Sequence, residues 1–97
     1  MRITFSVNGV AVRLTEERWN HICRRHPELI EQIEQILQTI QQPDFVQQGD
    51  VGTLMGCKKF LHKYLVVVYK EVSSEDGFIL TAYLTKHLRR RVTIWKL

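Results

Sequence analysis

The densest group of residues that could do chemistry lies in the stretch RWNHICRRHPEL, residues 18–29. It holds imidazoles, which exchange protons near neutral pH, and guanidinium groups, which bind phosphate oxygens. These side chains belong to Arg18, His21, Arg24, Arg25 and His26. Such a set is typical either of an active-site wall that handles a phosphate or of the solvated, basic end of a surface helix.

The spacing of these histidines does not predict a metal site. His21 and His26 are five residues apart, so on an α-helix their side chains diverge by about 140°. A zinc-binding helix instead carries its two histidines four residues apart on one face. Cys23 and His26 could share an ion, but no further ligand completes such a site. The chain has no glycine-rich phosphate-binding loop either, so we expect neither a metal nor a cofactor.

A second group of candidates lies in the C-terminal half of the chain. Thr81 and Tyr83 share one face of the predicted strand FILTAYLT, whose other face is apolar. Lys70 interrupts the end of the preceding apolar strand, HKYLVVVYKEV. If Lys70 pairs across from Thr81, it joins this polar face, whereas a slip of one residue sends it to the opposite side. The sequence leaves this register open.

The elements that must position both groups can be read from the sequence. Residues 2–14 predict a β-hairpin with a two-residue turn at Asn8-Gly9. Thr15 predicts a helix N-cap, and the helix that follows has one apolar face. That face consists of Trp19, Ile22, Cys23 and His26. Pro27 ends this helix and can also open the next.

The second helix is predicted over residues 29–40, where apolar residues recur every three or four positions. A weak strand or loop around residues 45–46 follows, and then a glycine-bearing turn region. The strands 62–72 and 78–85 flank the turn SSEDG, and RRVTIWKL predicts a last strand. Helices kept apart from a meandering sheet predict an α+β fold, with two helices on one face of a small antiparallel sheet.

Length and charge set further bounds. The chain of 97 residues predicts one domain, residues 1–97. No segment resembles a signal peptide or a membrane span, and Cys23 and Cys57 match no disulfide or redox pattern. We therefore expect a cytoplasmic protein with free thiols. Its net charge of +4 favours a polyanionic partner.

Three of these segments together carry a resemblance to a known family. LTEERWNHICRRHPEL, followed by VVVYK and then by ILTAYLT, resembles the phage-associated branch of the barnase–EndoU–colicin–RelE-like nucleases. The similarity runs from about Leu14 to Thr85 and leaves the N-terminal hairpin outside. It implies two helices on one face of a sheet and an active site on the other face.

The resemblance also implies a function and a set of site residues. Members of this superfamily are typically metal-independent ribonucleases, often toxins or toxin-derived effectors. Cleavage of RNA without a metal uses the ribose 2′-hydroxyl as the internal nucleophile and needs a general base and a general acid. Carried onto this sequence, the catalytic candidates are His21, Arg25, His26, Lys70, Thr81 and Tyr83. Because His26 lies on the apolar helix face, we expect it, rather than His21, to be structural.

The basic residues outside this set predict how RNA would be held. The RNA-binding candidates are Arg18, Arg24, Lys86, Arg89 and Arg90. An alternative is a non-catalytic module that binds RNA or a protein through the same basic surface. For a toxin, an acidic antitoxin-like protein is a plausible partner. The oligomeric state stays open, because the last strand could pair with a second copy.

Overall fold

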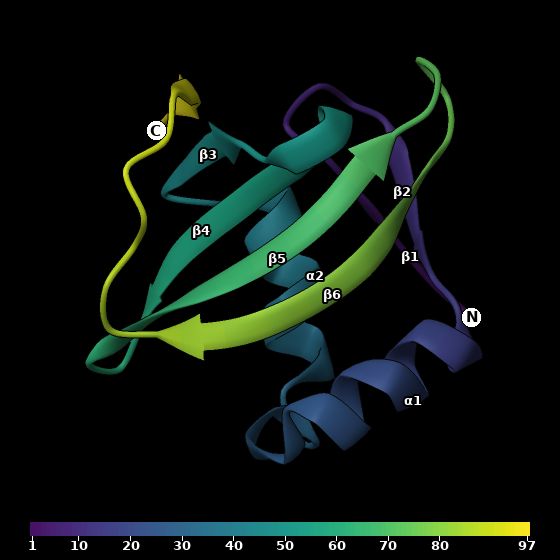
Figure 1. Ribbon diagram of the computed structural model, residues 1–97. Coiled ribbons are helices and arrows are strands. Elements are labelled where there is room, and N and C mark those ends of the chain that lie inside the picture. The colour runs from purple at the N-terminus through teal and green to yellow at the C-terminus, as the bar shows by residue number, and fades with distance from the viewer.

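The computed structural model describes all 97 residues and arranges them as one sheet with both helices on one side (Figure 1). Its elements are β1 (Arg2–Phe5), β2 (Ala11–Leu14), α1 (Glu16–Arg25), a 3₁₀ turn (Pro27–Leu29), α2 (Ile33–Gln41), β3 (Phe45–Gln48), a 3₁₀ turn (Asp50–Gly52), β4 (Leu54–Phe60), β5 (Lys63–Glu71), β6 (Gly77–Thr85) and β7 (Thr93–Lys96). The α2 helix packs against β4 and β5, and α1 packs against β6. The predicted α+β fold is confirmed.

The seven strands lie in the order β1-β2-β6-β5-β4-β3-β7. From β3 to β6 they form the expected antiparallel meander, but the two ends of the sheet differ from a meander. β2 pairs with β6 in parallel over only two residues, Val12 and Arg13, opposite Gly77 and Phe78. β7 pairs with β3, so residues 86–92, here called the strap, run back along the sheet from the end of β6 (Figure 1).

The N-terminal hairpin forms where the sequence predicts it, but its turn is longer by one residue. The Ser6 N–H donates to the Val10 carbonyl at 2.9 Å, which leaves residues 7–9 as the loop. Only Gly9 takes a positive φ, 77°, and this is the pattern of a three-residue hairpin loop. The expected two-residue turn at Asn8-Gly9 is therefore wrong.

The α1 helix begins and ends at the residues that favour a helix boundary. The Thr15 hydroxyl accepts a hydrogen bond from the Arg18 N–H at 3.2 Å, which confirms the N-cap. At the other end, Pro27 disfavours the helical conformation for the residue before it. His26 accordingly has φ −136° and ψ 72° and is the C-cap, outside the helix.

The α2 helix starts later than predicted. Residues 27–29 form a 3₁₀ turn, in which the Leu29 N–H donates to the His26 carbonyl at 2.9 Å, and α2 spans Ile33–Gln41. This turn redirects the chain between α1 and α2 while keeping Leu29 fully buried. The apolar period from residue 29 therefore reflects one buried face made by two elements.

The main core fills the space between the helices and the sheet. It contains twelve buried residues: Val12, Leu14, Ile22, Leu29, Ile36, Leu37, Ile40, Leu65, Val67, Tyr69, Ile79 and Ala82. The opposite side of the sheet, here called the open face, carries a smaller cluster of Met55, Cys57 and Val66. Phe45, Tyr64, Val68 and Tyr83 pack against this smaller cluster, together with Leu88 of the strap.

Tyr69 allows a test of the main core. Its side chain is fully buried and its hydroxyl has no hydrogen-bond partner. Because an unsatisfied buried hydroxyl is costly, we expect Tyr69→Phe to raise the free energy of unfolding by about 1 kcal/mol in urea titrations. Tyr64→Phe is the control, because the Tyr64 hydroxyl is not a buried group without a partner. This substitution should change the free energy of unfolding by less than about 0.5 kcal/mol. Destabilisation by Tyr69→Phe would contradict this picture.

The same residue predicts how stability depends on alkaline pH. Burial, with smaller effects from Glu71 and Cys57, raises the pKa of Tyr69 above its ordinary value of 10.0. The unfolded chain therefore loses this proton at a lower pH than the folded protein. Tyr69 therefore leaves stability independent of pH below pH 10 and lowers the free energy of unfolding as the pH rises above it, because only the unfolded chain then ionises. Tyr69→Phe should show a shallower loss there in the same urea titrations.

Candidate functional site

The predicted hydroxyl-bearing face of β6 is part of the open face. Tyr83 lies directly opposite Val66 on β5, and Thr81 lies opposite Val68. Val66 belongs to the small cluster on the open face, while the intervening Ala82 belongs to the main core. Thr81 and Tyr83 therefore point away from the helices, onto the side where the family resemblance expects an active site.

Lys70 reaches the same face by a route that the sequence did not reveal. It pairs with Phe78 rather than with Thr81, because the pairing shifts by one residue between Val68 and Tyr69. The extra residue on β6 is Leu80. Since Val66, Val68 and Lys70 alternate along β5, Lys70 still faces the open side, about 7 Å along the strand from Val68.

The Lys70 ammonium group has no carboxylate within ion-pair distance. The neighbouring Glu71 is occupied by the N-terminal hairpin, because the Ser6 hydroxyl donates to Glu71 Oε2 at 2.5 Å and Asn8 Nδ2 donates to Oε1 at 3.1 Å. The side chain of Lys70 instead runs past Gly52, with its Cε 3.9 Å from the position that a Cβ there would take. Lys70 is thus an uncompensated positive charge.

His26 lies beside Tyr83. Their ring centroids are 6.1 Å apart and the rings are tilted by 37°. α1 brings His26 there by lying along β6, where an Arg18 guanidinium nitrogen donates to the Leu80 carbonyl at 3.4 Å. The spacing suggested that His26 packs into the apolar helix face, but the structure shows that it does not. It leaves the helix at the C-cap, and its side chain is 31% exposed.

Glu28 accompanies His26 in a way that the sequence reading missed. A Glu28 carboxylate oxygen lies 3.7 Å from His26 Nδ1, too long for a hydrogen bond but within ion-pair distance when the imidazole is charged. The 3₁₀ turn after Pro27 produces this approach, because it folds Glu28 back toward the end of α1. The signal was the HPE sequence itself, since a proline turn returns the next residue toward the histidine.

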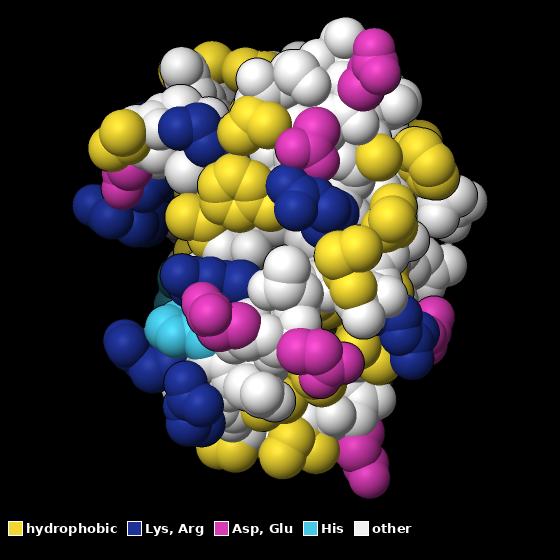
Figure 2. All heavy atoms as spheres, turned by 90° about the vertical axis from the view of Figure 1, so that its right-hand side faces the viewer, with side chains coloured by type: hydrophobic (Ala, Val, Ile, Leu, Met, Phe, Trp, Pro, Cys, Tyr) yellow, Lys and Arg dark blue, Asp and Glu magenta, His cyan; other side chains and the backbone are white.

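The other basic residues of α1 do not join Tyr83. His21 is half-buried and makes no hydrogen bond, and Arg24 and Arg25 are exposed in the last turn. Partial desolvation, with the charges of Arg18, Arg25, Arg24 and His26, lowers the pKa of His21. Figure 2 shows Lys and Arg side chains near the histidine surface in view, with an acidic side chain beside them. The exposed Arg24 and Arg25 at the end of α1, just before His26, are here called the basic rim.

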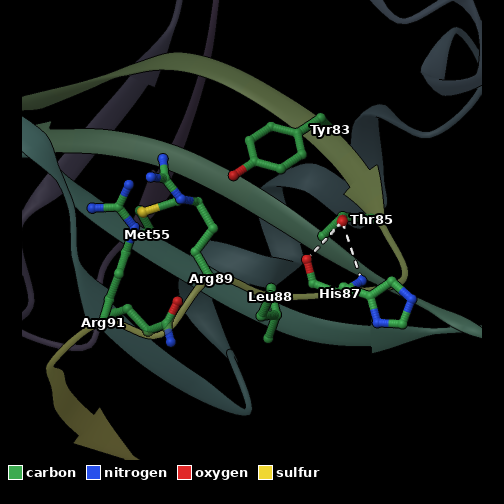
Figure 3. A pocket seen from close by; sticks show the side chains of 8 residues that line it. Met55, Tyr83, Thr85, His87, Leu88, Arg89 and Arg91 are labelled. Atoms are coloured by element: carbon green, nitrogen blue, oxygen red, sulfur yellow. Dashed lines mark hydrogen bonds between the residues drawn. The ribbon is translucent and has the colours of Figure 1, made fainter.

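A pocket of about 160 Å³ lies between the open face and the strap, and Tyr83 forms part of its wall (Figure 3). The sheet contributes Gln47, Met55, Tyr83 and Thr85, and the strap contributes His87, Leu88, Arg89 and Arg91. Thr85 holds the beginning of the strap, because its hydroxyl donates to the His87 carbonyl at 3.0 Å and accepts from the His87 N–H at 3.3 Å. Of the catalytic candidates, the pocket contains only Tyr83.

The three consecutive arginines of the strap divide into two kinds. Arg89 and Arg91 line the pocket and Arg90 does not, although Arg89 is exposed like Arg90 and only Arg91 is partly buried. Arg91 is the most constrained: an Nη donates to Asp50 Oδ1 at 3.0 Å, and its buried Nε has no partner. Lys86, the remaining RNA-binding candidate, is exposed and also outside the pocket.

The surroundings of Tyr83 favour its protonated form. Burial, followed by the charge of Cys57, raises the pKa of the Tyr83 hydroxyl, and Arg91 and Arg89 oppose this only in part. The hydroxyl is therefore a proton donor at neutral pH. In Figure 3 it points along the sheet toward the Arg89 and Arg91 side chains.

Several of these pocket residues were absent from the sequence prediction. Gln47, Met55, His87, Leu88 and Arg91 become neighbours only because the strap returns to β3. The arginine run was recognised, but Arg89 and Arg91, which line the pocket, could not be told from Arg90 before the path of the strap was known.

The structure contains neither a metal-binding group of side chains nor a helix that could span a membrane. No three His, Cys, Asp or Glu side chains come together in a group that could hold a metal ion. No helix has the length and apolar character needed to cross a bilayer. Comparison of the chain with protein-family models, with curated proteins and with solved structures found no match.

The Arg91–Asp50 pair predicts a titration that reports the path of the strap. A hydrogen bond from Arg91, aided by its charge, lowers the pKa of Asp50 from the ordinary value of 3.8. We expect Arg91→Gln to raise this pKa toward 3.8, as measured by carbon NMR of the carboxyl group. Arg90→Gln removes the same charge outside the pocket and should shift it less. Equal shifts in both variants would contradict the described path of the strap.

Proposed function

We propose that the protein is a metal-independent endoribonuclease of the toxin type, which cleaves RNA through the ribose 2′-hydroxyl. The observation that carries the proposal is the juxtaposition of His26 and Tyr83, 6.1 Å apart between ring centroids, beside a pocket lined by arginines. A proton acceptor, a proton donor and phosphate-binding cations are what this reaction needs in the absence of a metal.

The two rings take complementary parts in the proposed reaction. His26 accepts the proton of the 2′-hydroxyl, whose oxygen attacks the adjacent phosphorus. Tyr83 gives its proton to the 5′-oxygen as the bond from phosphorus to that oxygen breaks. The products are a 2′,3′-cyclic phosphate and a 5′-hydroxyl end. At neutral pH the Tyr83 hydroxyl, whose pKa burial raises, holds its proton and therefore enters the reaction as a donor.

The cations around the pair would stabilise the charge that develops on the phosphorane oxygens. Lys70 suits this role because it is on the open face and has no carboxylate partner. Thr81, on the same face, could orient the phosphate by a hydrogen bond. Arg25 lies one residue before His26 and is exposed, so it suits a contact with the RNA backbone outside the reacting atoms.

The place of action and the partners belong to the same proposal. An RNA-cleaving toxin would act in the cytoplasm, where its substrate is. An acidic antitoxin-like protein could cover the basic rim by charge complementarity. A non-catalytic module using the same surface for RNA or a protein is the alternative, and the following experiment separates it from the enzyme.

Purified protein in EDTA is expected to cut mixed-sequence RNA and to leave the all-deoxy counterpart intact. His26→Gln should lower the rate by roughly 10²- to 10⁴-fold, and Tyr83→Phe by a loss of similar order, because each removes a proton-transfer group. Gel analysis of end-labelled substrates measures both rates.

Two other histidine variants test whether the loss of activity is specific to His26. His62 lies in the exposed turn between β4 and β5, so His62→Ala should keep full activity. His21→Ala should lose less than His26→Gln does. Salt-sensitive RNA binding without any cleavage would favour the non-catalytic module. An inactive His21→Ala beside an active His26→Gln would overturn the assignment of the base.

Lys70 is tested separately, because its distance along the sheet from Thr81 and Tyr83 depends on the extra β6 residue, Leu80. We expect Lys70→Ala to lower kcat by about tenfold to a hundredfold, since the lost contact forms mainly in the transition state. Lys63→Ala, at the exposed start of β5, is the charge-matched control and should change kcat little. Unchanged cleavage by Lys70→Ala would remove this residue from the mechanism.

A further inference from the structure

We propose that the pocket beneath the strap binds a second RNA phosphate, next to the one that is cleaved, through Arg89 and Arg91. The inference rests on the proposed function for the identity of the ligand as RNA. The pocket itself depends on the strap, which lies beyond the segments that resemble the nuclease family.

The hydrogen bonding of Arg91 is incomplete. Its Nε is buried in a side chain that is only 17% exposed, and it has no acceptor. Asp50 engages one terminal nitrogen and so fixes the orientation of the guanidinium group. A buried donor without an acceptor is rare in folded proteins and calls for a missing ligand or water. Arg91 is therefore ready to bind a group that accepts hydrogen bonds.

The lining of the pocket is rich in hydrogen-bond donors and positive charge. Besides Arg91, the pocket offers the guanidinium of Arg89, which makes no ion pair, and the protonated hydroxyl of Tyr83. Asp50 offsets the charge of one arginine only. A phosphate is the part of RNA that only accepts hydrogen bonds, whereas the base edges mix donors and acceptors. The excess of donors and of positive charge therefore favours a phosphate over a base.

The pocket is small. The pocket measures about 160 Å³, below the roughly 300–1,000 Å³ of sites that enclose drug-sized ligands. It can take one phosphate group but not a nucleotide. Met55 and Leu88 supply an apolar wall that limits water, which strengthens contacts to a charged group.

The pocket lies next to the His26–Tyr83 pair. Tyr83 belongs to both sites: its ring lies beside His26, and its hydroxyl points toward the two arginines (Figure 3). A strand of RNA laid across this ring would present one phosphate near His26 and the next one to the pocket. Arg89 and Arg91 then hold the substrate in register without taking part in bond breaking.

The run of three arginines provides its own matched controls. Arg89→Gln, Arg90→Gln and Arg91→Gln each remove one positive charge, but only the outer two of the run, Arg89 and Arg91, line the pocket. The probe is a fluorescein-labelled, mixed-sequence 2′-O-methyl RNA, which has no free 2′-hydroxyl and cannot be cut. Fluorescence anisotropy gives its Kd at several salt concentrations.

The expected result is a difference within the run. Arg89→Gln and Arg91→Gln should each raise Kd about tenfold, as for the loss of a charge-assisted contact, and lower the salt slope by about 0.7. Arg90→Gln should change Kd by less than about twofold. With cleavable RNA, Arg91→Gln should raise KM more than it lowers kcat.

The possible failures can be told apart. Equal effects of all three substitutions, or no effect of Arg91→Gln, or no binding of the probe by the unaltered protein, overturns the inference. A fall in kcat alone would assign Arg91 to the cleaved phosphate instead of the next one. If RNA is not cut, yet the difference between Arg90 and Arg91 persists in Kd, the proposed function fails and this phosphate site stands.

Discussion

The short parallel contact between β2 and β6 is the constraint on which the rest of the site depends. It ends at Phe78, so the remaining outer edge of β6 has no strand neighbour and is available to α1. Arg18 ties the helix to this edge through the Leu80 carbonyl. Pro27 then ends α1 beside Tyr83 and releases His26 from the helix. A fold constraint and a local backbone preference together create the pair of rings.

Tyr83 belongs to both parts of the proposed site. Beside its ring, a histidine with a nearby carboxylate can exchange protons, and next to it a cationic pocket can hold the substrate. The strap makes this possible, since it crosses back to β3 instead of leaving the sheet. Burial keeps the shared tyrosine protonated, so one residue can serve as the acid and as a wall of the pocket.

Local signals in the sequence predicted most of the elements, and non-local geometry explains what they missed. The N-cap at Thr15 and the strands around SSEDG follow from residues close in the chain, and both were predicted. The start of α2 was wrong because a proline that can open a helix can equally open a 3₁₀ turn. His26 was misplaced because helical spacing assumes helical dihedral angles, which the C-cap does not have. The pairing partner of Lys70 depends on one extra residue at Leu80, and the role of Arg91 depends on the path of the strap; neither leaves a local signal.

The most direct test of the central claim is the identity of the ends that the protein leaves on RNA. Mass spectrometry of fragments produced in EDTA would determine them. The proposed roles of His26 and Tyr83 predict 2′,3′-cyclic phosphates paired with 5′-hydroxyl ends, because the 2′-oxygen becomes bonded to phosphorus. Fragments that carry 3′-hydroxyl and 5′-phosphate ends would contradict the account, because water would then be the nucleophile and the ribose would take no part.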